Sequence, residues 1–124
     1  GQAPEELRPP LSWLAVELII PENAAIDPNE VIFVSVRDFN SNSKMPDLAV
    51  KRRIGELRKP ILLSDRDSLM GRKLSEIGAL EVSAHVSPSG QAGEKNATWT
   101  GSVGPVRLKE GQNEIKILLR SKEL

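Results

Sequence analysis

The feature that most constrains the fold of this 124-residue chain is a repeated alternation of apolar and polar residues with a period of two. It is clearest at residues 80–87, where every second residue is apolar. Successive side chains of a β-strand point to opposite faces, so this pattern predicts a strand with one buried face. Similar runs at residues 14–20, 31–37 and 113–119 predict three more strands, separated by glycine, proline and polar turn signals.

Other segments are less regular. Residues 48–54 fit either a strand or a helix, and we favour a strand. Residues 60–64 predict a short strand, and residues 65–72 a turn that includes one helical turn. Residues 97–108 hold two glycines and a proline, so an irregular or bulged strand is expected there.

About seven short strands without a long helix indicate an all-β fold, a single β-sandwich of immunoglobulin or cupredoxin type. Residues 1–10, with three prolines, are expected to be a flexible lead-in, and residues 11–124 the sandwich. The alternating runs supply the predicted core: Leu14, Val16, Leu18, Ile32, Val34, Val36, Val82, Ala84, Val86, Ile115 and Ile117.

Composition argues against several kinds of chemistry. The chain has no cysteine and a single histidine, His85, which excludes thiol chemistry, a blue-copper site and haem attachment through paired cysteines. No nucleophile-elbow motif is present, so we expect no enzyme, no metal and no cofactor; a small hydrolase has little support. His85 is expected on the polar face of its strand. With zero net charge and few aromatic residues, nucleic-acid binding is not expected, and no apolar run is long enough to insert into a membrane.

Charge is distributed unevenly along the chain. Residues 1–43 hold seven acidic and two basic residues, whereas residues 44–73 hold nine basic and four acidic residues. The basic stretch has two interpretations. Its side chains neutralise the acidic first third, for example at Glu17 or Glu30, or they form a surface that attracts an acidic partner.

Several motifs occur here in the order and spacing of a known family. They are M-P-D-L-A-V-x-R at residues 45–52, D-S-L-M-x-x-K-L-S at 67–75 and V-S-A-H-V-S-P-S-G at 82–90. A strand at 31–37 precedes them, and Trp99-Thr100-Gly101 follows at a turn position. On these residues the chain, over about residues 14–106, resembles the C-terminal periplasmic domain of the bacterial cytochrome c maturation protein I (CycH type). It departs from the pattern at His85, where an arginine is expected, and in the loop at 91–98.

The resemblance implies a non-catalytic, periplasmic protein-interaction domain from an inner-membrane-anchored protein that also contains helical repeats. That protein would hold apocytochrome c and present it to the haem ligation complex, whose subunits attach the haem. The partners implied are therefore apocytochrome c, the haem ligation subunits, or both. A structural or adhesive sandwich of an exported protein unrelated to haem is the alternative. Because the basic stretch coincides with much of the resemblance, the predicted partner-binding residues are Lys44, Met45, Pro46, Lys51, Arg52 and Arg53.

Overall fold

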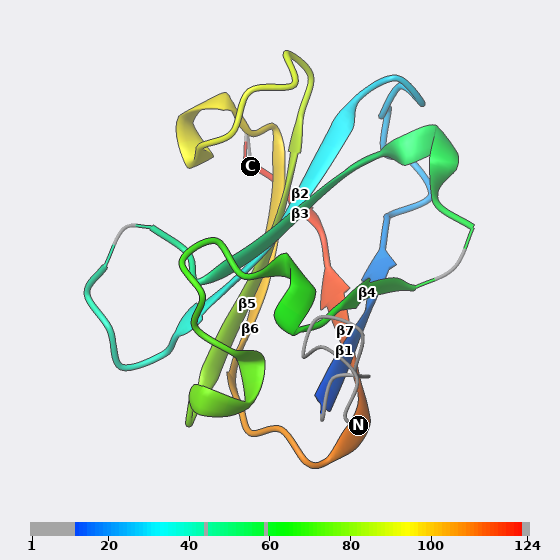
Figure 1. Cartoon of the computed structure of the whole chain (residues 1–124). Helices are drawn as coiled ribbons and strands as arrows, with labels where there is room; N and C mark the ends of the chain where they lie inside the picture. Colours follow the sequence, from blue (N-terminus) through cyan, green and yellow to red (C-terminus); the bar gives the residue numbers. More distant parts are fainter. Residues whose placement is uncertain (1–11, 44, 59, 123–124) are drawn as a thin grey trace, which may run out of the picture.

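The computed structural model describes residues 12–43, 45–58 and 60–122, and these residues form a sandwich of two β-sheets (Figure 1). The three-stranded sheet has the order β4-β1-β7, and the five-stranded sheet has the order β3-β2-β5-β6-β8. The strands are β1 (Ser12–Ile19), β2 (Val31–Asp38), β3 (Leu48–Arg53), β4 (Ile61–Leu63), β5 (Leu80–Ser87), β6 (Trp99–Val106), β7 (Gly111–Leu118) and β8 (Arg120–Ser121). The predicted all-β sandwich is confirmed, with the short β8 as the strand that the periodicity did not indicate.

The ambiguous segment at residues 48–54 is a strand. β3 pairs antiparallel with β2 from Leu48 opposite Val36 to Arg53 opposite Val31. Leu48 and Val50 are buried while Ala49 between them is only partly buried, which is the alternation of a strand at a sheet edge. The segment ends in a short 3-10 turn, η2 (Ile54–Glu56).

The core lies between the two sheets and confirms most of the predicted positions. Nine of the eleven are buried, and the exceptions are Leu18 and Ile115, which pack partly buried against the core. Leu18 lines a surface hollow, and Ile115 belongs to β7, one of the two edge strands of the smaller sheet. The turns between β4 and β5 also contribute: Leu74 of η4 (Leu74–Glu76) is fully buried.

The last part of the chain joins the two sheets. β7 runs parallel to β1 in the smaller sheet, and after Leu118 the chain crosses to the larger sheet, where β8 pairs with β6. The N–H of Leu119 donates to the carbonyl of Ile19 at 3.0 Å as the chain crosses. β6 passes this crossing at Gly101, where a Cβ atom would lie 2.3 Å from the carbonyl oxygen of Leu118.

The bulge expected in residues 97–108 is present. The register between β5 and β6 shifts between Leu80 and Val82, although β6 itself is continuous from Trp99 to Val106. Turn residues 65–72 include the predicted single helical turn, η3 (Asp65–Asp67), which Ser64 caps through its hydroxyl. The lead-in predicted at residues 1–10 lies outside the described residues, so its domain boundary remains a prediction.

Candidate partner-binding surface

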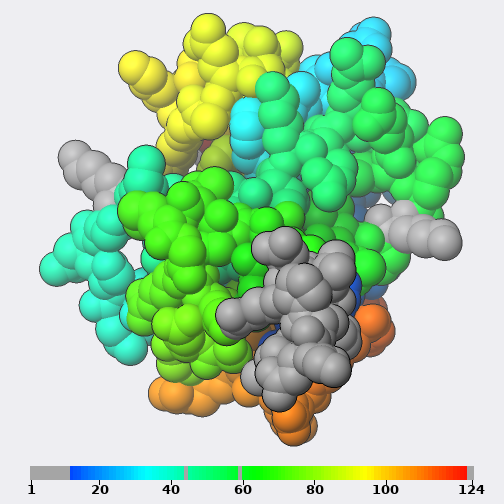
Figure 2. Space-filling view, in the orientation of Figure 1, coloured from blue at the N-terminus to red at the C-terminus, as the bar shows by residue number. Residues whose placement is uncertain are grey.

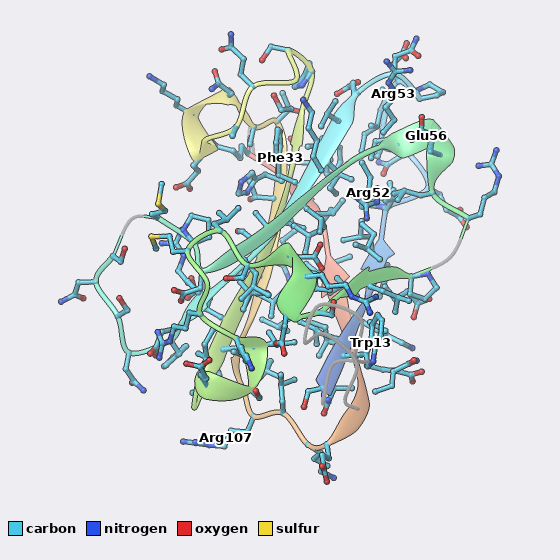
Figure 3. The ribbon with its side chains drawn as sticks, in the orientation of Figure 1. Trp13, Phe33, Arg52, Arg53, Glu56 and Arg107 are labelled. Carbon is cyan, nitrogen blue, oxygen red and sulfur yellow. The ribbon has the colours of Figure 1, made fainter. Side chains whose placement is uncertain are left out.

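The predicted partner-binding residues lie at the two ends of β3. Met45 and Pro46 belong to the loop that precedes the strand, and Lys51, Arg52 and Arg53 form its last half. A strand rises about 3.3 Å per residue, so the two groups are about 20 Å apart. Figure 3 shows Arg52 and Arg53 at the end next to η2. Lys44 lies outside the described residues. The structure therefore separates the predicted site into a basic end and a loop end.

The basic end, Lys51, Arg52 and Arg53, is exposed on an edge strand. Lys51 and Arg53 stand opposite Phe33 and Val31 on the outer face of the five-stranded sheet, and the ammonium of Lys51 lies 5.7 Å from the Phe33 ring centroid. Arg52 alternates to the other face, and its Nη1 donates to the carbonyl of Lys51 at 2.8 Å. Three adjacent cations thus cover both sides of one strand end.

The carboxylates suggested as partners for these cations are occupied elsewhere. Glu17 forms an exposed ion pair with Lys116, with 3.9 Å between Oε2 and Nζ. Glu30 instead accepts a hydrogen bond from the N–H of Asp27 at 2.7 Å. Within residues 12–43, 45–58 and 60–122, no ion pair involves Lys51, Arg52 or Arg53. Among these residues, the structure thus shows no neutralisation of the basic end across the sandwich.

The loop end exposes apolar side chains. Met45 is 56% exposed, and the N–H of Leu69 donates to the carbonyl of Asp47, which brings the exposed Leu69 and Met70 to the loop that contains Met45. Arg72 connects these loops to the end of β2 through Asp38 at 3.1 Å and Asp47 at 3.7 Å.

Phe39, after β2, is exposed next to this ion-pair network. The sequence pattern did not single out Phe39, Leu69 or Met70 as exposed apolar residues. For Leu69 and Met70 a signal was present, because two adjacent apolar residues inside a polar turn are expected to be exposed.

His85 occupies a half-buried position on the outer face of β5. Its ring lies 6.3 Å from the ring of Phe33, centroid to centroid. Burial lowers the pKa of His85; the nearby Arg37 and Lys122 add to this, while Glu94 opposes it. Among the described residues, no hydrogen bond joins the His85 ring to a hydroxyl or carboxylate. The position predicted from the alternation, on the polar face of the strand, is confirmed.

A shallow hollow lies beside β1 and β4 and includes Glu17, Leu18, Leu57 and Arg58. It combines one carboxylate with one guanidinium and apolar walls, without a histidine or a hydroxyl group that could serve as a nucleophile. In the part of the chain that the structure describes, no three histidine, cysteine, aspartate or glutamate residues are grouped so as to hold a metal ion. The same residues include no helix long and apolar enough to cross a membrane.

Comparison with known proteins supports the motif resemblance. The family model described as the cytochrome c-type biogenesis protein H Ig-like domain matches residues 14–119, which include all strands from β2 to β7 and most of β1. Neither the curated proteins nor the solved structures gave a match. The family match covers well over half of the chain and agrees with the two-sheet architecture. The chain therefore belongs to the family of cytochrome c-type biogenesis protein H Ig-like domains.

Proposed function

We propose that this domain is a non-catalytic protein-interaction module that helps to hold or present apocytochrome c to the haem ligation complex. Family membership connects the chain with the maturation of c-type cytochromes. The observation that carries the more specific proposal is the basic end of β3, where three exposed cations have no ion-pair partner among the described residues. Cations of this kind attract an acidic partner and act mainly on the rate of association.

The same proposal covers location and chemistry. The family supports a position outside the cytoplasm, and we place the domain in the periplasm as part of an inner-membrane-anchored protein. Binding rather than catalysis is supported by the environment of His85, which has an aromatic ring and charged groups near it but no oriented nucleophile among the described residues. Haem attachment is then left to the ligation subunits.

The test measures association of the domain with immobilised apocytochrome c, holocytochrome c and each haem ligation subunit. The double variant Lys51→Glu/Arg53→Glu should bind at least one of the maturation partners tenfold more slowly, with a weaker dependence on salt. Lys95→Glu/Lys109→Glu is the matched control, because it changes the net charge equally at exposed residues outside β3. Thermal unfolding checks that both variants stay folded.

Absence of binding to every maturation protein would refute the proposal and favour a structural or adhesive domain. If the β3 variant and the control weaken binding equally, the net charge of the domain, and not the basic end of β3, attracts the partner.

A further inference from the structure

β3 leaves part of its backbone without a neighbouring strand. In antiparallel strands, residues alternate between pairs that exchange both backbone hydrogen bonds and pairs that exchange none. The N–H of Ile54 donates to the carbonyl of Glu30, so the hydrogen-bonding pairs of β3 with β2 fall on Arg52 and Val50. The backbone groups of Lys51 and Arg53 therefore point away from β2. The Lys51 carbonyl already accepts a hydrogen bond from Nη1 of Arg52 at 2.8 Å, so the exposed Arg52 side chain must release this carbonyl when a strand is added.

Only the last half of this edge is open. At its beginning, Leu48 forms a β-bridge with Ser68, and Leu69 donates to the carbonyl of Asp47. Beyond its end, the chain turns away from the edge, since the N–H of Gly55 donates to the carbonyl of Pro28. What remains is the last half of β3, residues 51–53, about 10 Å long. Figure 2 shows teal and green atoms from this part of the chain at the molecular surface.

An open sheet edge can pair with another strand, and the charges of Lys51 and Arg53 decide which sequence that strand should have. Lys51 and Arg53 are two residues apart, so both lie beside an added strand on the same face of the sheet. A second copy of this chain pairing through β3 would place like charges opposite one another, which is unfavourable. A strand with acidic residues at alternate positions would instead place a carboxylate opposite each cation. Its intervening residues would lie on the other face of the sheet, opposite Val50 and Arg52, where they can contact Val50 and the apolar stem of the Arg52 side chain.

We infer that the free edge of β3 binds an extended, acidic segment of a partner protein by strand addition, with alternate carboxylates opposite Lys51 and Arg53. The inference rests on the proposed function, because it specifies how a protein-interaction domain would bind its partner. Backbone hydrogen bonds to Lys51 and Arg53 supply affinity, and the alternation of acidic residues supplies specificity.

The test uses a fluorescein-labelled peptide of alternating valine and glutamate, three of each, and its counterpart with lysine in place of glutamate. Fluorescence anisotropy at low salt should show binding of the glutamate peptide alone. Lys51→Glu/Arg53→Glu should reverse this preference, whereas Lys95→Glu/Lys109→Glu should keep it. Binding of both peptides to the parent domain with equal affinity would overturn the inference.

Two N-methylated peptides separate strand addition from attraction between charges alone. In an antiparallel addition, the glutamates opposite Lys51 and Arg53 also carry the bonded N–H groups. Methylating the glutamate amides should therefore weaken binding at least tenfold, while methylating the valine amides should not. If the two methylated peptides bind equally well, strand addition is wrong.

The two proposals fail separately. If Lys51→Glu/Arg53→Glu binds every maturation protein that the parent domain binds, each at the parent rate, the role of the β3 edge is refuted and the proposed function stands. If the parent domain binds the glutamate peptide but no maturation protein, the proposed function is refuted and the edge remains a peptide-binding site.

Discussion

Gly101 is the residue at which a single methyl group should disturb the sandwich most. It lies in β6 where the chain crosses from β7 to β8. An added Cβ would lie 2.3 Å from the carbonyl oxygen of Leu118 and 2.7 Å from Cγ2 of Ile117. Ordinary contacts of a Cβ begin at 3.4 Å, so the carbonyl would have to move by about 1 Å. That carbonyl belongs to the segment that Leu119 anchors to Ile19 through its backbone N–H.

The size of the effect follows from the nature of the obstacle. Inserting a methylene-sized group into a packed core costs about 1–3 kcal/mol when side chains can adjust. Here the nearest atom is backbone in a crossing between two sheets, so the upper part of that range applies to Gly101→Ala. Replacing glycine also lowers the conformational entropy of the unfolded chain, which offsets about 0.4–1 kcal/mol of this loss in the free energy of unfolding. The expected net loss in the free energy of unfolding is therefore about 2 kcal/mol, or a fall in Tm of roughly 5–10 °C for a chain of this length.

Urea unfolding followed by tryptophan fluorescence measures this loss, because Trp13 and Trp99 place one reporter in each sheet. Gly78→Ala is the matched control: its Cβ would have no atom within 4 Å, so its stability should be unchanged or slightly raised. Equal unfolding midpoints for the two variants would refute the close approach of β6 to the crossing.

Three further predictions concern the core and two titrating groups. Val82→Asp should unfold the domain, because it places an unpaired charge at a fully buried position at a cost of several kcal/mol. Ser102→Asp is the control: Ser102 is exposed on the neighbouring strand β6, so this variant should keep the parent Tm. A folded Val82→Asp variant would contradict the assigned register of β5. The pKa of Asp38 should lie below its ordinary value of 3.8, first because a backbone N–H donates to its carboxylate and then because Arg72 is nearby, so Arg72→Gln should raise this pKa only in part by NMR titration. The pKa of His85 is lowered, chiefly by burial, so the unfolded chain binds a proton at His85 more readily than the folded domain does. The free energy of unfolding should therefore be highest above pH 6.5 and fall as the pH drops from there toward the lowered pKa. In His85→Gln, urea unfolding at several pH values should show that this part of the pH dependence is lost.

Much of the fold could be predicted because it depends on local pattern. The alternation at residues 80–87 reflects a strand with one buried face, and β5 has the predicted bounds. The same holds for the half-buried position of His85 on the polar face of that strand and for most of the predicted core. The motifs at residues 45–90 were also sufficient to indicate the family, since order and spacing are properties of the chain alone.

The parts that could not be predicted depend on contacts between residues far apart in sequence. Pairing of β1 with β7 brings together strands about 100 residues apart, and the burial of Leu119 and the requirement for Gly101 follow from the crossing that comes next.

The sequence by itself determined that Lys51, Arg52 and Arg53 form a basic run, in a segment whose pattern fitted either a strand or a helix. Only the tertiary structure decided that this strand is the edge of a sheet, that its basic end is open and that Met45 lies at the other end. The physical reason is that a strand becomes an edge through the absence of a neighbour, and the neighbours of a strand are set by the packing of the whole chain.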